Sequence, residues 1–463
     1  MSSLRPLMVL GCSSSSGKSL LVTGLCRWFA RQGIDVAPFK AQNMSNNARV
    51  VHGGEIGVAQ WLQARAAGIE PTVDTNPVLL KPEADTRSQV IVHGVARPDL
   101  TAMAWRERGP SLWPPMTESY QHLADQHDLV IIEGAGSPAE INLDDLVNNR
   151  IVDHTDAAAI LVADIDRGGA FAHLVGTWTL VPDPTRRRLT GFVLNKFRGD
   201  ASLLDPAPTL VTERTGMHHV GVLPMLAHEL PDEEGGSIRA TAPPGAPRVV
   251  IVRYPYASNL DEWHLLGHAA HVRWATTPAD LDGADLVILP GSKHVTADMH
   301  WMIARHLDTA IRATRTRIVG ICGGAMLAGR RITDPHGIEG GDTDGLGLID
   351  LTTEMAATKI TTATHVTLNP PAGPWETLRG VTADGYEIRN GVVSGTAPTI
   401  GPGAWADGNV LVTTVHGLFE HPDVVAAVVG HRPEPVLDAT FDLLADAVDE
   451  HLDTAFLRRV VGC

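Results

Sequence analysis

Cys322 is the residue of this chain best suited to act as a nucleophile. It lies in the run Gly320-Ile321-Cys322-Gly323-Gly324, between an apolar stretch typical of a strand and a stretch that favours a helix. This pattern is the thiol counterpart of the nucleophile elbow, in which small residues permit a tight strand-to-helix turn that projects one side chain. The positive end of the helix dipole would favour the thiolate, which is the reactive form of cysteine. The alternative is a buried cysteine in a glycine-rich turn.

A histidine stands at the end of another predicted strand. Residues 410–415 are rich in Val and Thr, and they are followed by His416 and Gly417. A cysteine and a histidine that each follow a strand can meet as nucleophile and base in a sheet protein. This pairing favours a catalytic interpretation of both residues.

A phosphate-binding loop is predicted near the N-terminus. An apolar strand over residues 6–10 and a helix over residues 20–31 flank a loop of glycines and serines that ends in Gly-Lys-Ser. In such loops the backbone N–H groups and the helix dipole bind phosphates, the lysine adds a positive charge, and the hydroxyl reaches Mg²⁺. The predicted nucleotide-binding residues are Gly11, Ser15, Ser16, Gly17, Lys18 and Ser19, together with Asn195 at the end of a later strand.

The expected nucleotide is ATP. Guanine-binding proteins use Asn-Lys-x-Asp, whereas the corresponding run here ends in Arg198. Partitioning ATPases that depend on a protein partner carry an additional lysine near the start of the loop, where this chain has Cys12 and Ser13. A nucleotide switch that controls a protein partner is therefore an alternative that the sequence disfavours.

Polar side chains follow other predicted strands. Lys40, Gln42 and Asn43 come after the strand over residues 36–39, and Glu133 comes after an apolar strand over residues 129–132. Open α/β sheets bind ligands at the carboxyl ends of their strands. A carboxylate there suits Mg²⁺ coordination or a role in directing the attacking group, and the alternative is an acid that caps the loop. Ser19 and Glu133 are the predicted metal ligands.

Composition limits the remaining possibilities. The chain has 463 residues, 44% hydrophobic and 19% charged, which is enough for two or three domains with substantial cores. A net charge of −16 argues against non-specific nucleic-acid binding. The four cysteines lack CxxC spacing, the N-terminus lacks a signal-peptide pattern, and no apolar stretch reaches the roughly 18 residues that span a bilayer. We expect a cytoplasmic protein that contacts no membrane.

The order of strands and helices predicts the domain organisation. Alternating strand and helix signals imply a doubly wound, mostly parallel α/β sheet in residues 1–230. Residues 231–248 are rich in Gly, Pro and acidic residues and are expected to form a linker. A second α/β domain is expected over residues 249–463, with more β-structure after residue 350.

Longer motifs run through both halves of the chain. The first half carries Val36-Ala37-Pro38-Phe39-Lys40-Ala41-Gln42-Asn43-Met44-Ser45 and further motifs over residues 54–57, 76–82, 133–143, 164–169 and 191–200. The second half carries motifs over residues 289–293, the Cys322 elbow, Gly385-Tyr386-Glu387-Ile388 and His416-Gly417-Leu418-Phe419. In these motifs, which cover nearly the whole chain, the sequence resembles the cobyric acid synthases, which are glutamine-dependent amidases of cobalamin biosynthesis.

The resemblance implies an ATP-dependent domain similar to dethiobiotin synthetase, followed by a class I glutamine amidotransferase domain. The implied reaction amidates the b, d, e and g carboxylates of adenosyl-cobyrinic acid a,c-diamide, with glutamine as the nitrogen donor and with ATP and Mg²⁺. By family position Cys322 attacks glutamine and His416 transfers the proton. Lys40 would steady the transferred phosphoryl group, and backbone N–H groups near Gly291 and Gly323 would form an oxyanion hole.

Several residues depart from the family pattern. Leu418 stands where glutaminases of this class carry the acidic partner of the histidine, and Glu420 is a weak substitute. Arg389 follows Glu387-Ile388 where histidine is usual. Gln42, Asn43, Glu387 and Arg389 are the expected contacts of the corrinoid substrate. The related cobyrinic acid a,c-diamide synthases, which share the two-domain plan, are the alternative within the class.

Overall fold

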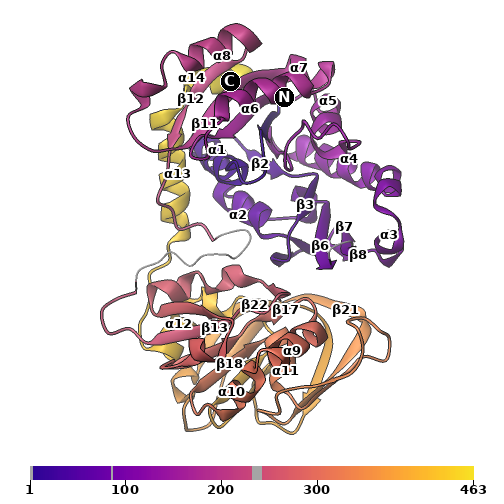
Figure 1. The fold of residues 1–463 in the computed structure, drawn as a ribbon, viewed down its shortest axis with the longest axis vertical. Helices are drawn as coiled ribbons and strands as arrows, with labels where there is room; N and C mark the ends of the chain where they lie inside the picture. Colours follow the sequence, from indigo (N-terminus) through magenta and orange to yellow (C-terminus); the bar gives the residue numbers. More distant parts are fainter. Residues whose placement is uncertain (1–3, 85–86, 232–241) are drawn as a thin grey trace.

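The computed structural model describes residues 4–84, 87–231 and 242–463. It has two domains stacked along the long axis of the molecule, and both chain termini lie in the first of them (Figure 1). Residues 232–241 of the expected linker lie outside the described residues.

The first domain is built on a parallel sheet of six strands in the order β12-β11-β10-β1-β9-β2. Every pairing in this sheet is parallel, as the sequence predicted. The central strands are continuous apolar runs because helices cover both faces. The strands are β1 (Leu7–Gly11), β2 (Val36–Phe39), β9 (Leu129–Glu133), β10 (Ala158–Asp164), β11 (Leu189–Phe197) and β12 (His218–Pro224).

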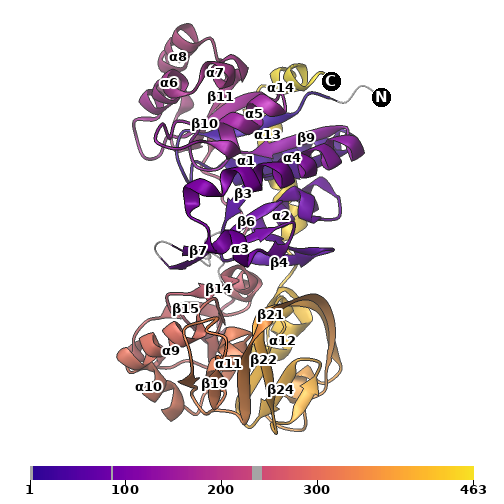
Figure 2. The same cartoon turned by 90° about the vertical axis from the view of Figure 1, so that its right-hand side faces the viewer.

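Helices flank this sheet, and a smaller β-structure extends from it toward the second domain. The helices are α1 (Lys18–Arg31), α2 (Val58–Ala67), α3 (Pro98–Ala102), α4 (Gly109–Gln126), α5 (Ile151–His154), α6 (Ala170–Leu180), α7 (Asp183–Arg188) and α8 (Ala207–Thr215). The extension contains β3 (Gln42–Met44), β6 (Val78–Ala84), β7 (Arg87–Val92) and β8 (Val95–Ala96), and a hairpin of β4 (Ala48–Val51) and β5 (Gly54–Gly57). Strands β4 and β7 lie at the end of the first domain that faces the second (Figure 2).

The second domain has a seven-stranded sheet in the order β15-β13-β16-β18-β25-β24-β23. The strands from β15 to β25 pair in parallel, and β24 and β23 extend the sheet antiparallel. These strands are β13 (Arg248–Val252), β15 (His271–Ala275), β16 (Leu286–Leu289), β18 (Arg317–Ile321), β23 (Thr399–Gly401), β24 (Ala404–Asp407) and β25 (Val410–Thr413).

Helices and a long hairpin complete the second domain. The helices are α9 (Val295–Ala304), α10 (Leu307–Ala313), α11 (Gly323–Ala328) and α12 (Pro422–Val429). The hairpin pairs β21 (Leu351–Leu368) with β22 (Val381–Gly395), which agrees with the β-rich composition expected after residue 350. Short strands β14 (Ala257–Ser258), β17 (Gly291–Ser292), β19 (Arg331–Thr333) and β20 (Thr343–Asp344) lie around this core.

The C-terminal segment does not belong to the second domain, so the expectation that this domain runs to residue 463 is wrong. Helices α13 (Leu437–His451) and α14 (Thr454–Val461) return to the first domain, where α13 lies against α1 (Figure 1). Trp28 Nε1 donates to Asp449 Oδ1 at 2.8 Å. Leu457 is fully buried in the same core as the strands of the first sheet. An amphipathic pattern predicts burial but does not identify the domain that provides the partner surface.

Within the described residues, the helices are too short or too polar to cross a lipid bilayer.

Leu457→Ala tests the assignment of the C-terminal helices. Removing this buried side chain should destabilise the first domain by about 2–5 kcal/mol, because the cavity left behind closes only in part. Hydrogen exchange measured by mass spectrometry should show faster exchange in α1 and β12, with β13 and β18 unchanged. Leu443→Ala is the matched control, since Leu443 lies on α13 with 40% of its surface exposed. Faster exchange confined to the second domain would contradict the assignment.

Candidate active sites

The turn at Cys322 has the geometry that its sequence predicts. Strand β18 ends one residue before Cys322, α11 begins one residue after it, and Cys322 has a φ of 50°. A positive φ is costly for a non-glycine residue and is typical of functional turns. A Cβ on Gly324 would lie 1.9 Å from the carbonyl oxygen of Leu289, and one on Gly323 would lie 2.5 Å from the backbone nitrogen of Ser292. Gly323 and Gly324 therefore allow this turn to lie directly against the backbone of residues 289–292.

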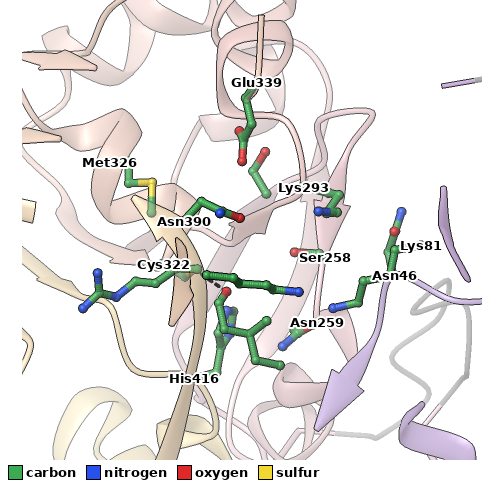
Figure 3. Close-up of a pocket in the computed structure, with 14 residues that line it drawn as sticks. Asn46, Lys81, Ser258, Asn259, Lys293, Cys322, Met326, Glu339, Asn390 and His416 are labelled. Atoms are coloured by element: carbon green, nitrogen blue, oxygen red, sulfur yellow. Dashed lines mark hydrogen bonds between the residues drawn. The ribbon is translucent and has the colours of Figure 1, made fainter. Parts of the chain in front are cut away.

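His416 lies beside this turn. Strand β25 pairs in parallel with β18, so the segments that follow the two strands emerge at the same edge of the sheet. Cys322 and His416 line one cavity (Figure 3). The Cys322 Sγ contacts the carbonyl oxygen of Ile388 at 3.7 Å. The structure thus brings the thiol and the imidazole to the same cavity, as the sequence predicted.

Glu262 is the acidic partner of His416, and the sequence did not predict this pairing. His416 Nδ1 lies 3.2 Å from Glu262 Oε1, and the Gly417 N–H donates to Glu262 Oε2 at 2.9 Å. Glu262 is fully buried in a turn of 3₁₀-helix, η5 (Leu260–Trp263). Glu420, considered from the sequence, contacts Arg49 instead. A signal was present, because Glu262 belongs to an acidic pair placed between the apolar residues Leu260 and Trp263.

Glu262 changes the protonation of His416. Burial alone lowers the pKa of His416, but the neighbouring charges of Glu262 and Cys322 outweigh it and raise the pKa to about 10. The imidazole is therefore held as an imidazolium near neutral pH. A protonated imidazole in the same cavity as a thiol can serve as the acid in nucleophilic chemistry at the sulfur.

The cavity around Cys322 is rich in charged and amide groups from both domains (Figure 3). Lys81 and Asn46 come from the first domain, and Lys293, Glu339 and Asn390 come from the second. Two expected oxyanion-hole glycines flank the site: Gly323 follows the thiol, and a Cβ on Gly291 would lie 2.8 Å from Cε1 of His416. Their backbone N–H groups as oxyanion donors stay a prediction.

The phosphate-binding loop connects β1 to α1, as predicted. Gly17 has a φ of 94°, and a Cβ there would lie 2.0 Å from Nδ2 of Asn195. Asn195 donates to the carbonyl oxygen of Ser16 at 2.9 Å, so its amide braces the loop. Lys18 Nζ donates to the carbonyl oxygen of Gly136 at 3.0 Å. The loop suits a phosphate, because the buried Ser16 Oγ has no hydrogen-bond partner among the residues that the structure describes.

Glu133 is the centre of a buried polar cluster beside this loop. Ser19 Oγ and Lys40 Nζ each donate to Glu133 Oε1 at 2.8 Å, and Gln63 Nε2 donates to Oε2 at 2.5 Å. Burial raises the pKa of Glu133, but the charge of Lys40 and the donated hydrogen bonds outweigh it and lower the pKa below its usual value. The carboxylate is thus ionised, and its position next to Ser19 supplies the oxygen ligands that Mg²⁺ prefers.

A large cavity of about 1030 Å³ opens above the phosphate-binding loop. Both domains line it, the first with Lys18, Ser19 and Glu133 and the second with Arg253 and Tyr254. The predicted nucleotide residues Ser15 and Gly17 line it as well, whereas Gly11, Ser16 and Asn195 support the loop from behind.

Asn46 connects the two sites. It lines both the large cavity and the cavity of Cys322, which therefore adjoin at this residue. Within the described part of the chain, its buried Oδ1 has no hydrogen-bond partner. The Asn46 side chain thus lies where the two cavities adjoin.

The four residues expected to contact a corrinoid do not gather in one place. Asn43 lines the large cavity, whereas Arg389 lines the cavity of Cys322. Glu387 accepts a hydrogen bond from Arg389 Nε at 2.9 Å, and Gln42 pairs with β6. Contact of these four residues with a corrinoid therefore stays a prediction.

Comparisons with known proteins give consistent results. Residues 7–233 match the family described as the CobQ/CobB/MinD/ParA nucleotide binding domain, and residues 248–424 match the CobB/CobQ-like glutamine amidotransferase domain. The chain is 49% identical to the cobyric acid synthase of Variovorax paradoxus, with 99% of each chain aligned. It is 49% identical to that of Paracidovorax citrulli, with 98% of each aligned. It is 45% identical to that of a Polaromonas species over 99% of this chain and 98% of the relative.

Glu262→Gln tests the pairing with His416 through the pH dependence of stability. The pKa of His416 is about 10 in the native state and about 6.5 when unfolded. Between these values the native state holds a proton that the unfolded state has released, so the free energy of unfolding falls as pH rises. In the variant the native pKa moves back toward its ordinary value, and this decline should shrink.

Denaturant unfolding at a series of pH values measures the decline. Glu229→Gln is the control, because Glu229 also pairs with histidines, His264 and His268 at 3.3 Å and 3.2 Å, and should leave the decline unchanged. An equal decline in the wild type and in Glu262→Gln would refute the pairing.

Proposed function

The chain belongs to the cobyric acid synthase family, and on this premise we propose that it amidates the b, d, e and g carboxylates of adenosyl-cobyrinic acid a,c-diamide. Glutamine supplies the nitrogen, ATP activates each carboxylate, and cobyric acid is the product. The observation that carries the proposal is the presence, in adjoining cavities of one chain, of a Cys322–His416–Glu262 group and a phosphate-binding loop.

Cys322 would release ammonia from glutamine. Its thiolate attacks the side-chain amide carbon, and the C–N bond breaks as the His416 imidazolium protonates the leaving nitrogen. The resulting thioester is hydrolysed by water, with His416 as the base, to glutamate and free thiol. Glu262 holds the Nδ1 side of the imidazole and so keeps Nε2 available for the proton. Backbone N–H groups of Gly291 and Gly323 would stabilise the oxyanion.

The first domain would activate the substrate. A carboxylate is a poor electrophile, so transfer of the terminal phosphoryl group of ATP gives an acyl phosphate, which ammonia then converts to the amide with loss of phosphate. Lys18 and the loop N–H groups would bind the phosphates, and Ser19 and Glu133 would hold Mg²⁺. Mg²⁺ when bound would neutralise charge on the transferring phosphoryl group. Lys40 Nζ lies 2.8 Å from Glu133 Oε1 and so beside the place where the transferring phosphoryl group would lie.

The large cavity is the proposed site for ATP and the corrinoid. The protein carries a net charge of −16, yet both ligands are anionic. The cavity compensates for this unfavourable field with cationic side chains of both domains: Lys18, Lys40, Arg167, Lys196 and Arg253. All four cysteines of the chain are free, which fits the reducing cytoplasm that we propose as its location.

Mass spectrometry of the reaction products tests the proposal. The purified protein is incubated with adenosyl-cobyrinic acid a,c-diamide, glutamine, Mg²⁺ and ATP, and the number of carboxylates amidated is counted. Amidation at the b, d, e and g positions is expected. No amidation of this substrate, together with amidation of unmodified cobyrinic acid at positions a and c, would favour a cobyrinic acid a,c-diamide synthase.

Cys322→Ala should separate the two nitrogen sources. The rate with glutamine should fall at least about a thousandfold, because the nucleophile is lost. The rate with ammonium salts should stay near that of the wild type, since the thiol serves only to release ammonia. Cys463→Ser, at the exposed C-terminal residue, is the control. Equal loss with both nitrogen sources would show that Cys322 acts elsewhere or in folding.

Lys18→Ala provides the complementary result. Without the lysine charge the phosphoryl transfer should slow on the order of a thousandfold. Amidation should therefore be lost with glutamine and with ammonium salts alike. Near-normal amidation by this variant would refute the assignment of the loop.

Asn46→Phe tests whether ammonia moves between the two cavities at the residue where they adjoin. The phenyl ring should obstruct the passage of ammonia, so amide formation with glutamine falls several-fold while glutamate release continues. The ratio of glutamate released to amide formed then rises, and a high ammonium concentration restores synthesis. Asn46→Ala, which leaves the passage open, is the matched control. An unchanged ratio in Asn46→Phe would exclude this route.

A further inference from the structure

Arg49 is a buried charge that crosses from the first domain into the second. It lies on β4, in the hairpin of β4 and β5 that contacts β21 and β22. Its side chain is 5% exposed. Its guanidinium packs over the ring of Trp61 in its own domain at 5.5 Å and over the ring of Tyr386 in the second domain at 5.3 Å.

The guanidinium contacts three polar groups of the second domain. Nη1 donates to the hydroxyl of Tyr386 at 2.5 Å, and Nη2 donates to Glu420 Oε1 at 2.5 Å. Nη2 also donates to Asp261 Oδ2. The planar fork of arginine allows one side chain to reach all three, which a lysine ammonium on a flexible stem does less well.

Each of these three residues lies close to a member of the Cys322–His416–Glu262 group, in space or along the chain. The ring of Tyr386 stacks on the imidazole of His416, with centroids 5.5 Å apart and planes 19° from parallel. The two residues also exchange backbone hydrogen bonds of 3.1 Å and 2.8 Å. Asp261 immediately precedes Glu262 in η5, and Glu420 lies in η9 (Leu418–Glu420), which follows His416. One guanidinium therefore fixes the surroundings of both His416 and Glu262.

Electrostatics makes this arrangement depend on Arg49. Asp261, Glu262 and Glu420 bring three carboxylates together in a largely buried region. Removing a buried cation leaves such carboxylates uncompensated, so they must take up protons, draw in water or move apart. Because Asp261 and Glu262 are consecutive in η5, a shift of Asp261 would also displace Glu262. A shift of Tyr386 would remove the ring that stacks on the His416 imidazole.

We propose that Arg49 is a positioning residue that makes the glutamine site competent only when the first domain is docked. The inference rests on the proposed function, since it assigns a regulator to the same Cys322 site. When the β4–β5 hairpin is docked, Arg49 holds His416 in its active position. When the domains are apart this support is lost, which limits hydrolysis of glutamine without amide formation.

Arg49→Met tests the inference by removing the charge while keeping most of the aliphatic length. Release of glutamate from glutamine should fall about a hundredfold, as expected when a catalytic group is misplaced by about 1 Å. The loss should appear in kcat rather than KM, because Arg49 does not line the cavity of Cys322. Amidation with ammonium salts should stay within a few-fold of the wild type, which also shows that the variant folds. Arg49→Lys should recover part of the glutaminase rate.

The matched control is Arg65→Met. Arg65 lies on α2 and packs over the same Trp61 ring at 5.5 Å, but it is exposed. This variant should keep the wild-type glutaminase rate. A loss equal to that of Arg49→Met would trace the effect to Trp61 and overturn the inference.

Tyr386→Phe gives a second and milder test. The ring remains to stack on His416, but the hydroxyl that accepts from Arg49 is lost. The double variant should lose less than the product of the two single losses, because both changes break the same connection. Independent losses, or equal loss of glutamine- and ammonium-dependent amidation in Arg49→Met, would overturn the inference. Absence of amidation by the wild-type protein would instead count against the proposed function itself.

Discussion

Ion pairs between the two domains are buried at the surface where the domains meet. A charge that is buried there needs an opposite charge next to it, and this requirement determines the geometry around Cys322 and around the phosphate-binding loop. Glu55 of the first domain is fully buried between Lys81 of its own domain and Lys359 of the second. Burial raises the pKa of Glu55, but the two lysines outweigh it and lower the pKa to about 2. In a second group the signs are reversed: Arg49 of the first domain is the cation, and Asp261 and Glu420 of the second domain are the anions. Removing one member of such a pair costs about 3–5 kcal/mol, whereas separating the domains would expose both to water. We therefore expect the docking of the domains to be coupled to the alignment of Glu262 and His416.

The path of the chain strengthens this coupling. The second domain is connected to the first by the segment before β13 and again by the segment between α12 and α13. Because α13 and α14 are packed into the core of the first domain, the second domain is held at both of its ends. Two connections restrict the separation of domains more than one would. This restriction agrees with the proposed function, in which ammonia formed at Cys322 has to reach an activated carboxylate before it escapes to water.

Much of the fold and part of the site could be predicted from the sequence, for local reasons. Continuous apolar strands predict a parallel sheet, and the glycines around Cys322 and Lys18 predict the two turns, because each signal lies within a few adjacent residues. The contact of Glu262 with His416 spans 154 positions, and that of Arg49 with Tyr386 spans 337. Contacts of this range depend on how whole elements pack. For the same reason the amphipathic C-terminal segment did not indicate which domain it joins.

The central claim is that one chain forms ammonia at the Cys322 site and uses it at the phosphate-binding site without release. It is tested most directly by a competition between two nitrogen sources. The enzyme is supplied with glutamine that carries a heavy-isotope amide nitrogen, together with unlabelled ammonium salts. The concentrations are kept below those that saturate amidation with glutamine or amidation with ammonium. Mass spectrometry then reports the isotope in the amides formed. We expect the label of glutamine to be retained almost undiluted at pH values where most ammonium is protonated. Dilution of the label to the ratio in bulk solution would contradict the account.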